Sequence, residues 1–211
     1  MKIQGEKEED HRHLLKMRAI SSLIAGVDEV GKGSLFGPVF AGAVILSKSN
    51  ELTLLSKGLK DSKKLNSRQR NNLVPLIKKN SIAWSLGQAS AREIDNIGIR
   101  NATEKAMIRA LDKFSSTPEL ILVDGILPIR LWEGQQHTQV RGESHFPSIA
   151  AASVLAKEAR DELIKRLANK YSCYGLEKNK GYGTEIHRKN LIKIGSCRLH
   201  RKSFLSKLKR D

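Results

Sequence analysis

The chain has little cysteine, few aromatic residues and no long apolar run. Two of its 211 residues are cysteines, Cys173 and Cys197, which is too few for a disulfide framework, and their spacing is not that of a zinc site. No apolar run approaches the roughly 18–20 residues that span a bilayer, and residues 1–10 lack the apolar stretch of a signal peptide. Aromatic residues make up 5% of the chain, which disfavours a surface of stacked rings for single-stranded nucleic acid. These absences favour a cytoplasmic protein with no membrane partner.

Positive charge is what the sequence has in excess. Lys and Arg number 38 against 22 Asp and Glu, a formal net charge of +16, and residues 157–211 alone hold 16 basic and 6 acidic side chains. Clustered Lys and Arg bind phosphates with release of counterions, so the charge indicates a polyanionic partner such as nucleic acid. A non-catalytic RNA-binding or ribosome-binding protein would show the same charge.

The order of apolar runs and helical patterns predicts one α/β domain. The first two strands form a hairpin across a glycine-rich loop, and the uniformly apolar fourth strand lies inside the sheet. Ser67 is the expected N-cap of the first helix, in which Pro75 makes a break or kink possible. Strands are expected at residues 23–28, 39–46, 82–89, 120–123 and 137–141, and helices at 67–79, 91–97, 101–114, 148–167 and 184–194. We divide the chain into an N-terminal tail (1–20), the domain (21–195) and a basic C-terminal tail (196–211).

Acidic residues stand at the ends of three of these strands. Asp28 and Glu29 come at the end of the first, Asp124 follows residues 120–123, and Glu143 follows the last. Ligands of α/β sheets bind at such strand ends, and converging carboxylates attract hard divalent cations such as Mg²⁺ or Mn²⁺. Each acid alone could be a turn residue or a helix cap. An adjacent pair with two further acids, inside a basic protein, favours a metal site that acts on a phosphodiester.

The glycine-rich loop after the first strand offers an alternative that the residues themselves oppose. Residues 26–33 nearly match the phosphate-binding pattern G-x-x-x-x-G-K-[ST], but Gly33 stands where Ser or Thr should ligate Mg²⁺. Asp28 and Glu29 would also lie inside a loop that must surround phosphate anions. Gly31 and Gly33 instead leave the backbone open to a substrate, unless they simply form a hairpin turn.

Five sequence blocks together resemble the ribonuclease HII family. They occur in the family's order and extend over roughly residues 22–205: GVDEVGKGSLFGPVFAGAVIL (26–46), KDSKKL (60–65), LVDG (122–125), RGESHFPSIAAASVLAKEARD (141–161) and KGYGT (180–184). The resemblance implies a ribonuclease H-like fold, with a mixed five-stranded sheet flanked by helices and a helical C-terminal region. It also implies a metal-dependent endonuclease that cuts the RNA strand of RNA–DNA hybrids and incises at ribonucleotides embedded in duplex DNA.

The resemblance also assigns roles to individual residues. Asp28, Glu29 and Asp124 match metal-ligand positions of the family, and Glu143 takes the fourth, where the family usually has Asp and the ribonuclease HIII group has Glu. The family's G-R-G turn, which contacts the ribose 2′-hydroxyl, appears as Gly31-Lys32-Gly33. Lysine in place of arginine keeps the charge but loses the bidentate contact with phosphate.

Three more residues are candidates for substrate binding. Tyr182 matches the family tyrosine that packs on the sugar beside the cut and helps to recognise an RNA–DNA junction. Lys63 and Lys64 could bind phosphate, although a solvated basic loop would look the same.

The chemistry expected from these residues is hydrolysis assisted by two divalent ions, Mn²⁺ or Mg²⁺, with 3′-hydroxyl and 5′-phosphate products. No Ser/His/Asp nucleophile set is evident, and no small-molecule cofactor is expected. The expected partners are RNA–DNA hybrids and duplex DNA that contains ribonucleotides, and the expected oligomeric state is a monomer.

Overall fold

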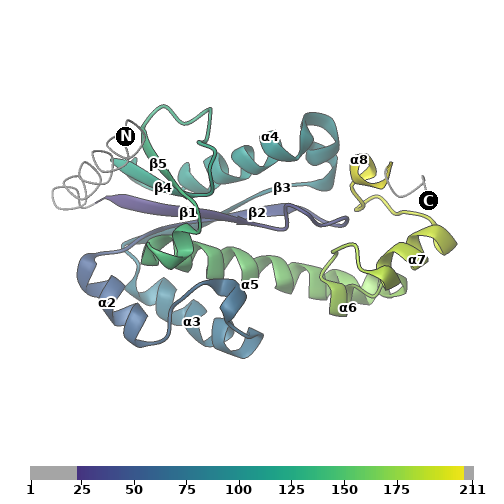
Figure 1. Cartoon of the computed structure of the whole chain (residues 1–211), viewed down its shortest axis with the longest axis horizontal. Coiled ribbons are helices and arrows are strands. Elements are labelled where there is room, and N and C mark those ends of the chain that lie inside the picture. Colours follow the sequence, from purple (N-terminus) through teal and green to yellow (C-terminus); the bar gives the residue numbers. More distant parts are fainter. Residues whose placement is uncertain (1–22, 207–211) are drawn as a thin grey trace, which may run out of the picture.

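A central five-stranded sheet organises the molecule, as a computed structural model shows for residues 23–206 (Figure 1). The strand order is β3-β2-β1-β4-β5. β1 pairs antiparallel with β2 and parallel with β4, so the sheet is mixed. The strands are β1 (Ile24–Val30), β2 (Val39–Ile45), β3 (Ala83–Ala89), β4 (Leu120–Asp124) and β5 (Gln135–Gln139). This confirms the predicted hairpin, the internal position of β4 and the mixed five-stranded sheet.

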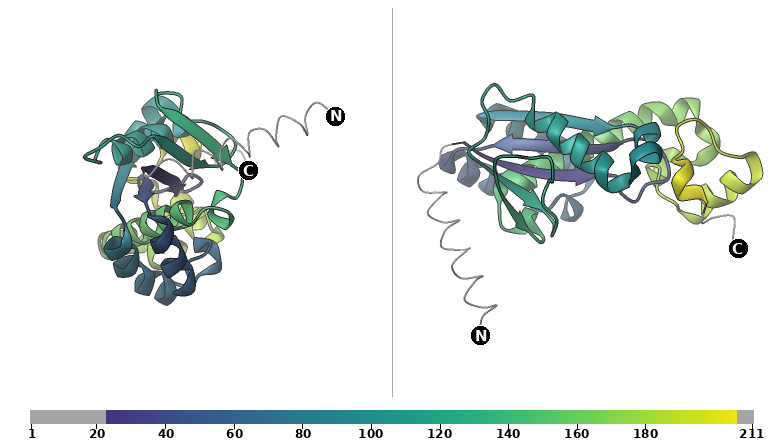
Figure 2. Two further views of the ribbon diagram at one scale, coloured as in Figure 1. Left: turned by 90° about the vertical axis from the view of Figure 1, so that its left-hand side faces the viewer. Right: turned by 90° about the horizontal axis from the view of Figure 1, so that it is seen from above.

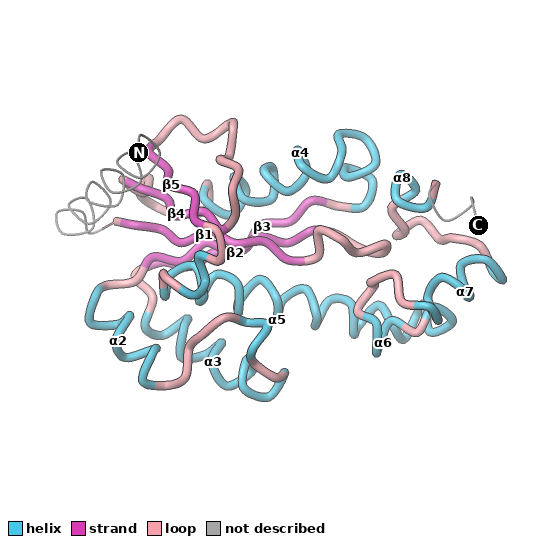
Figure 3. Tube along the Cα trace, in the orientation of Figure 1, coloured by secondary structure: helices cyan, strands magenta, loops and turns pink. Residues whose placement is uncertain are grey.

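Helices cover both faces of the sheet (Figures 1 and 3). α4 (Ala91–Leu111) packs on β2 and β3, and α5 (Pro147–Lys170) packs on β1 and β2 from the other face. α2 (Lys48–Ser56) and α3 (Ser67–Asn80) lie against α5. Two apolar clusters, one under α4 and one under α5, form the main core.

The close approach of α5 to the sheet depends on small residues on both sides. A Cβ at Gly42 of β2 would lie 2.3 Å from the carbonyl oxygen of Ala152, so only glycine fits there. Residues 150–152 are all alanine and fully buried or nearly so. Tight packing of this kind fixes the helix relative to β1, and therefore fixes its side chains relative to the strand's acidic residues.

The helical predictions hold except at details. α3 is capped by Asn66 rather than by Ser67, and it continues through the exposed Pro75. The break predicted between the helices at 91–97 and 101–114 is confirmed, because the element labelled α4 consists of two helical parts separated at Gly98, whose φ of 77° is not helical.

The C-terminal part of the chain extends beyond one end of the sheet (Figure 2). It contains α6 (Leu176–Asn179), α7 (Glu185–Ile194) and α8 (Lys202–Leu205) around a small apolar cluster. Residues 196–206, which we assigned to a basic tail, pack onto the domain there, and His200 and Arg201 are buried. The predicted tail at 1–20 and residues 207–211 lie outside the described residues.

Candidate active site

The four predicted carboxylates come from two adjacent strands and a short 3-10 turn. β1 extends to Val30, so Asp28 and Glu29 lie inside the strand and project to opposite faces of the sheet. Asp28 is buried next to Ser153 of α5, whereas Glu29 faces α4 across a cavity. Asp124 is the last residue of β4. Glu143 lies in the 3-10 helix η2 (Gly142–Ser144), just after the edge strand, and is also buried.

A tight turn joins Glu143 to Asp124. Arg141 adopts a left-handed conformation with φ 55°, which turns the chain back toward β4. The Gly142 amide then donates a 2.7 Å hydrogen bond to Oδ1 of Asp124. A Cβ at Gly142 would lie 2.6 Å from Cδ1 of Ile149, so a side chain there would push the turn away from the helix.

We use the name acidic centre for Asp28, Glu29, Asp124 and Glu143, and burial and neighbouring charges shift the pKa values of Asp28, Asp124 and Glu143. Burial, followed by the charge of Glu29, raises the pKa of Asp28 well above its ordinary value. Burial and the neighbouring Glu143 raise the pKa of Asp124 to about 6. For Glu143 burial favours the neutral acid, but its own backbone amide, Asp124 and Lys63 together lower the pKa below its ordinary value. Carboxyl groups packed this closely ionise together only if positive charge compensates them.

Two lysines supply part of that compensation. Lys32 Nζ lies 2.6 Å from Glu29 Oε1, and Lys63 Nζ lies 3.4 Å from Glu143 Oε1. Both ammonium groups are largely exposed, so both can move toward another anion. Lys64 is exposed on the same turn as Lys63 and pairs with none of the four acids. The structure therefore distinguishes Lys63, which pairs with an acid of the centre, from Lys64, which does not, although the sequence gives both the same candidate role.

The acidic centre fits a cation by its chemistry. Oε2 of Glu143 is buried and has no hydrogen-bond partner, an unfavourable state for a carboxylate oxygen unless a cation binds it. All four side chains offer oxygen ligands, which Mg²⁺ and Mn²⁺ prefer. Within residues 23–206, no three His, Cys, Asp or Glu side chains are grouped closely enough in this structure to hold a metal ion together. The acids are thus neighbours with unsatisfied ligand capacity rather than a closed cage.

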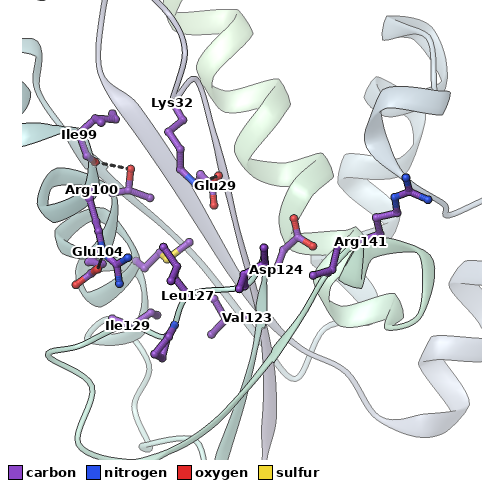
Figure 4. Close-up of a pocket in the computed structure, with 16 residues that line it drawn as sticks. Glu29, Lys32, Ile99, Arg100, Glu104, Val123, Asp124, Leu127, Ile129 and Arg141 are labelled. Carbon is purple, nitrogen blue, oxygen red and sulfur yellow. Dashed lines mark hydrogen bonds and ion pairs between the residues drawn. The ribbon is translucent and has the colours of Figure 1, made fainter. Parts of the chain in front are cut away.

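A cavity of about 600 Å³ opens beside the acidic centre (Figure 4). Glu29, Lys32 and Asp124 line it on the side of the sheet, and Arg141 lines its rim. Its other walls come from α4 and from the loop after β4. Glu29 and Asp124 are therefore open to a ligand from the α4 side of the sheet, whereas Asp28 and Glu143 are buried and do not line the cavity.

The glycine turn, residues 31–33, lies at the end of β1 and returns the chain into β2. Gly31 has a φ of +87°, and its carbonyl accepts a hydrogen bond from the Ser34 amide. The loop leads into a strand and not into a helix, so it lacks the helix N-terminus on which a phosphate-binding nucleotide loop depends. The P-loop alternative is thereby excluded.

Tyr182 lies beside the glycine turn although 150 residues separate them in the sequence. Ser34 and Tyr182 form an isolated β-bridge, and the amides of Leu35 and Phe36 both donate to the carbonyl of Gly181. The ring is partly buried beside the guanidinium of Arg160, at 5.4 Å. The structure therefore brings Lys32, Tyr182 and the acidic centre to the same end of β1.

Sequence reasoning missed two buried arginines near this loop. Arg160 and Arg201 are both fully buried. Arg160 belongs to the i, i+4 row that includes Ala156, Ile164 and Ala168, all buried, and this spacing could have revealed it. Arg201 had no such signal because it stands in a generally basic segment.

Comparisons with known proteins agree with this architecture. The family model described as Ribonuclease HII matches residues 25–207. A ribonuclease HII of Prochlorococcus marinus strain NATL1A is 81% identical over 192 residues, which cover 91% of this chain and 98% of the relative. That of Synechococcus sp. strain CC9902 is 57% identical over 187 residues, covering 89% and 94%.

Solved structures share the fold at lower identity. The ribonuclease H2 of Pyrococcus horikoshii OT3 has a TM-score of 0.73 at 23% identity, covering 89% of this chain and 99% of that one. The ribonuclease HII of Archaeoglobus fulgidus, solved in a complex with PCNA, has a TM-score of 0.71 at 26% identity, covering 85% and 93%. A Bst-RNase HIII structure in complex with Mn²⁺ has a TM-score of 0.67 at 23% identity, covering 91% and 72%.

No helix among residues 23–206 is long and apolar enough to cross a membrane. The fold is ribonuclease H-like, and the matched model covers most of the chain. The chain belongs to the ribonuclease HII family and is a ribonuclease H, a nuclease that hydrolyses nucleic acid.

Proposed function

We propose that this chain cuts the RNA strand of RNA–DNA hybrids and incises duplex DNA at single embedded ribonucleotides, with two divalent cations held by the acidic centre. The observation that carries the proposal is the position of the centre. Four carboxylates, one of which has a buried oxygen without a hydrogen-bond partner, lie at the same end of β1 as Tyr182 and the glycine turn, whose Lys32 and Gly33 are exposed. The first set suits a metal-assisted hydrolysis, and the second set suits recognition of one sugar.

Asp28, Glu29, Asp124 and Glu143 would hold the cations. When bound, the cations supply an activated water for attack on phosphorus and stabilise the charge that develops on the phosphate and the leaving 3′-oxygen. The four side chains contribute the negative charge that attracts the cations and fixes their place. No side-chain nucleophile takes part, so the products carry a 3′-hydroxyl and a 5′-phosphate.

Lys32 and Lys63 would have two successive roles, one without cations in the acidic centre and one with them. In the structure each neutralises one acid, Glu29 or Glu143, and cations in the centre would take over that neutralisation. The ammonium groups are then free to bind phosphates of the substrate, with Lys32 acting as a point charge. Lys64, which faces solvent, contributes to the general positive field.

The glycine turn and Tyr182 would give the selectivity for RNA. Lys32 and Gly33 are exposed, so backbone groups of this part of the turn would bond a ribose 2′-hydroxyl, the group that distinguishes RNA from DNA. The ring of Tyr182 would pack on the adjacent sugar. Because this contact needs only one 2′-hydroxyl, a single ribonucleotide in DNA suffices for incision.

Three duplexes test the proposal: an RNA–DNA hybrid, a DNA duplex with one ribonucleotide, and the same duplex without it. We expect Mn²⁺-dependent or Mg²⁺-dependent cutting of the first two and none of the third. Equal cutting of the all-DNA duplex would refute recognition of the 2′-hydroxyl. Cutting of the hybrid alone would refute incision at single ribonucleotides.

A further inference from the structure

Two buried arginines meet beneath the loop that carries the glycine turn. Arg160 of α5 and Arg201 of the C-terminal segment are both 0% exposed. Among the described residues, neither guanidinium lies within ion-pair distance of a carboxylate; both bind mainly backbone carbonyls. Burial of an arginine is costly, so such positions usually serve a geometric purpose. We call these two residues the arginine brace.

Arg160 connects the loop to the segment that carries Tyr182. Its Nη2 donates to Ser34 Oγ at 2.6 Å and to the Phe36 carbonyl at 3.1 Å, and its Nη1 donates to the Lys180 carbonyl at 2.9 Å. A Cβ at Gly31 would lie 2.2 Å from Nε of Arg160. The guanidinium therefore lies directly against the glycine turn, in the space that the missing side chain leaves.

Arg201 holds the two ends of the same loop. Its Nη1 donates to the Lys32 carbonyl, in the middle of the glycine turn, and its Nε donates to the Gly37 carbonyl, both at 2.9 Å. The backbone repeats this attachment, since the Arg201 amide donates to the Leu35 carbonyl and the Gly37 amide donates to the Leu199 carbonyl. A lysine has one nitrogen and could not bond both carbonyls in this geometry.

A pair of histidines attaches the same C-terminal segment to Tyr182. The Cys197 amide donates to Nδ1 of His200, so Nε2 of His200 carries the proton and donates to Nε2 of His187 at 3.1 Å. Nδ1 of His187 in turn donates to the Tyr182 carbonyl at 2.9 Å. Both rings are buried and both must be neutral for this chain of bonds to form. The glycine turn and Tyr182 are thus held by one segment near the end of the protein.

We propose that Arg201 is a positioning residue for substrate recognition, which acts with Arg160 to hold the glycine turn and Tyr182 at a fixed separation. The proposal rests on the proposed function, in which these two groups contact the ribonucleotide and its neighbouring sugar. It assigns residues 197–201 a role in selectivity without any contact of their own with nucleic acid. It also predicts that the selectivity for a single ribonucleotide depends on Arg201 more than cutting of a long hybrid does. A long hybrid offers many 2′-hydroxyls in many registers, whereas the single site offers one.

The test compares Arg201→Gln and Arg201→Lys with Arg166→Gln, a control that removes the same charge from an exposed position of α5. Hydrogen exchange is measured at the amides of Leu35, Phe36 and Gly37, without substrate. In both Arg201 variants we expect exchange at least about 10-fold faster at these amides, because a lost charged hydrogen bond corresponds to such a factor. Amides of β1 and β2 should exchange as in the parent. Unchanged exchange at residues 35–37, or equal acceleration throughout the sheet, would overturn the proposal.

The kinetic arm measures kcat/KM on the single-ribonucleotide duplex and on the long hybrid. We expect the Arg201 variants to lose about 10-fold on the former and no more than about 3-fold on the latter, as misplaced contacts reduce rates without abolishing chemistry. An equal loss on both substrates would mean a merely structural role and would overturn the proposal. If Arg201→Gln does not fold, Arg201→Lys alone decides. Failure of the parent enzyme to cut at single ribonucleotides would refute the proposed function instead, whatever the exchange data show.

Discussion

The acidic centre and the arginine brace are both built on buried charged side chains, and the protein around them treats the two differently. The acidic centre keeps an unbonded buried oxygen on Glu143 and a raised pKa on Asp124, and its nearest cations are the exposed ammonium groups of Lys32 and Lys63. In the arginine brace, every guanidinium nitrogen except Nη2 of Arg201 donates a hydrogen bond to a carbonyl or hydroxyl oxygen of the protein.

The difference indicates which charge belongs to the fold and which belongs to the reaction. The arginines are nearly satisfied by the protein, so removing them should disturb the loop that they hold. The carboxylates of the acidic centre repel one another and leave one buried oxygen without a partner, so neutralising one should leave the fold intact and remove activity. The four predictions below test that distinction.

The largest effect should come from Asp124→Asn. The change keeps the shape of the side chain and its place beside the Gly142 amide, but it removes a charge from the acidic centre. We expect cutting of the hybrid to fall at least about 100-fold, since even outer partners of metal ligands are worth 10–100-fold. Thermal stability should not fall, because a repulsive carboxylate has been removed.

Asp112→Asn is the matched control for that prediction, because Asp112 is exposed at the end of α4, outside the acidic centre. It should cut at the parent rate. If Asp124→Asn retained full activity, the acidic centre would not be the site of hydrolysis.

Two glycine substitutions in the glycine turn test whether Arg160 of the brace constrains that turn. Gly31→Ala puts a side chain at a φ of +87° and onto the guanidinium of Arg160, so we expect a loss of about 1–3 kcal/mol in the free energy of unfolding and slower cutting. Gly33→Ala meets nothing within 4 Å and should change that free energy by less than about 0.5 kcal/mol. Urea unfolding of both variants measures this. Equal destabilisation would show that Arg160 does not constrain the turn.

A smaller effect should appear in the pH dependence of stability of the metal-free protein. The Asp124 pKa of about 6 lies above its ordinary value of 3.8, so the folded state binds this proton more tightly than the unfolded state. The resulting stabilisation is complete below the ordinary value and is lost as the pH rises through about 6. In EDTA, the parent should therefore lose more stability than Asp124→Asn between about pH 5 and about pH 7. Identical pH profiles would contradict the raised pKa.

The smallest effect should separate Lys63 from Lys64. Lys63→Ala removes the ammonium group next to Glu143, and a pair whose lysine is largely exposed and 3.4 Å from its acid is worth about 0–1 kcal/mol. We expect KM for the hybrid to rise by no more than about 5-fold, which is the same energy expressed as affinity. Lys64→Ala should raise KM less, because Lys64 pairs with none of the acids. A larger effect from Lys64 would reverse our assignment of the phosphate contact.

The acidic centre could be predicted from the sequence because its signal is local. Asp28 and Asp124 interrupt or end apolar strands, where packing gives no reason for an acid, and the strand pattern itself places them at one end of the sheet. Glu143 also followed from its place after a strand, and the resemblance to the ribonuclease HII family gave it the fourth ligand position and gave Tyr182 its contact with the sugar. The hairpin and the internal β4 followed from uniformly apolar runs.

Arg201 of the arginine brace could not be predicted in the same way, whereas Arg160 lies in a row of buried residues on α5. Arg201 stands among Arg198, His200 and Lys202, and nothing in such a run tells which side chain turns inward. Its burial follows from contacts with residues more than 160 positions earlier, at Lys32 and Gly37. The same long-range packing explains why residues 196–206 are part of the domain although their composition is typical of a solvated tail. A truncation after Leu199 would remove Arg201 of the brace together with the positive charge of the C-terminal segment. Such a truncation therefore cannot measure the contribution of that charge to substrate binding alone.

One measurement tests the central claim most directly, namely the chemistry of the ends left at a single embedded ribonucleotide, with Mn²⁺ and with EDTA. Metal-dependent hydrolysis by the acidic centre predicts one nick with a 3′-hydroxyl and a 5′-phosphate, and no nick in EDTA. A nick that persists in EDTA and leaves a 2′,3′-cyclic phosphate would contradict the account, because it would make the 2′-hydroxyl the nucleophile and leave the four carboxylates without a role.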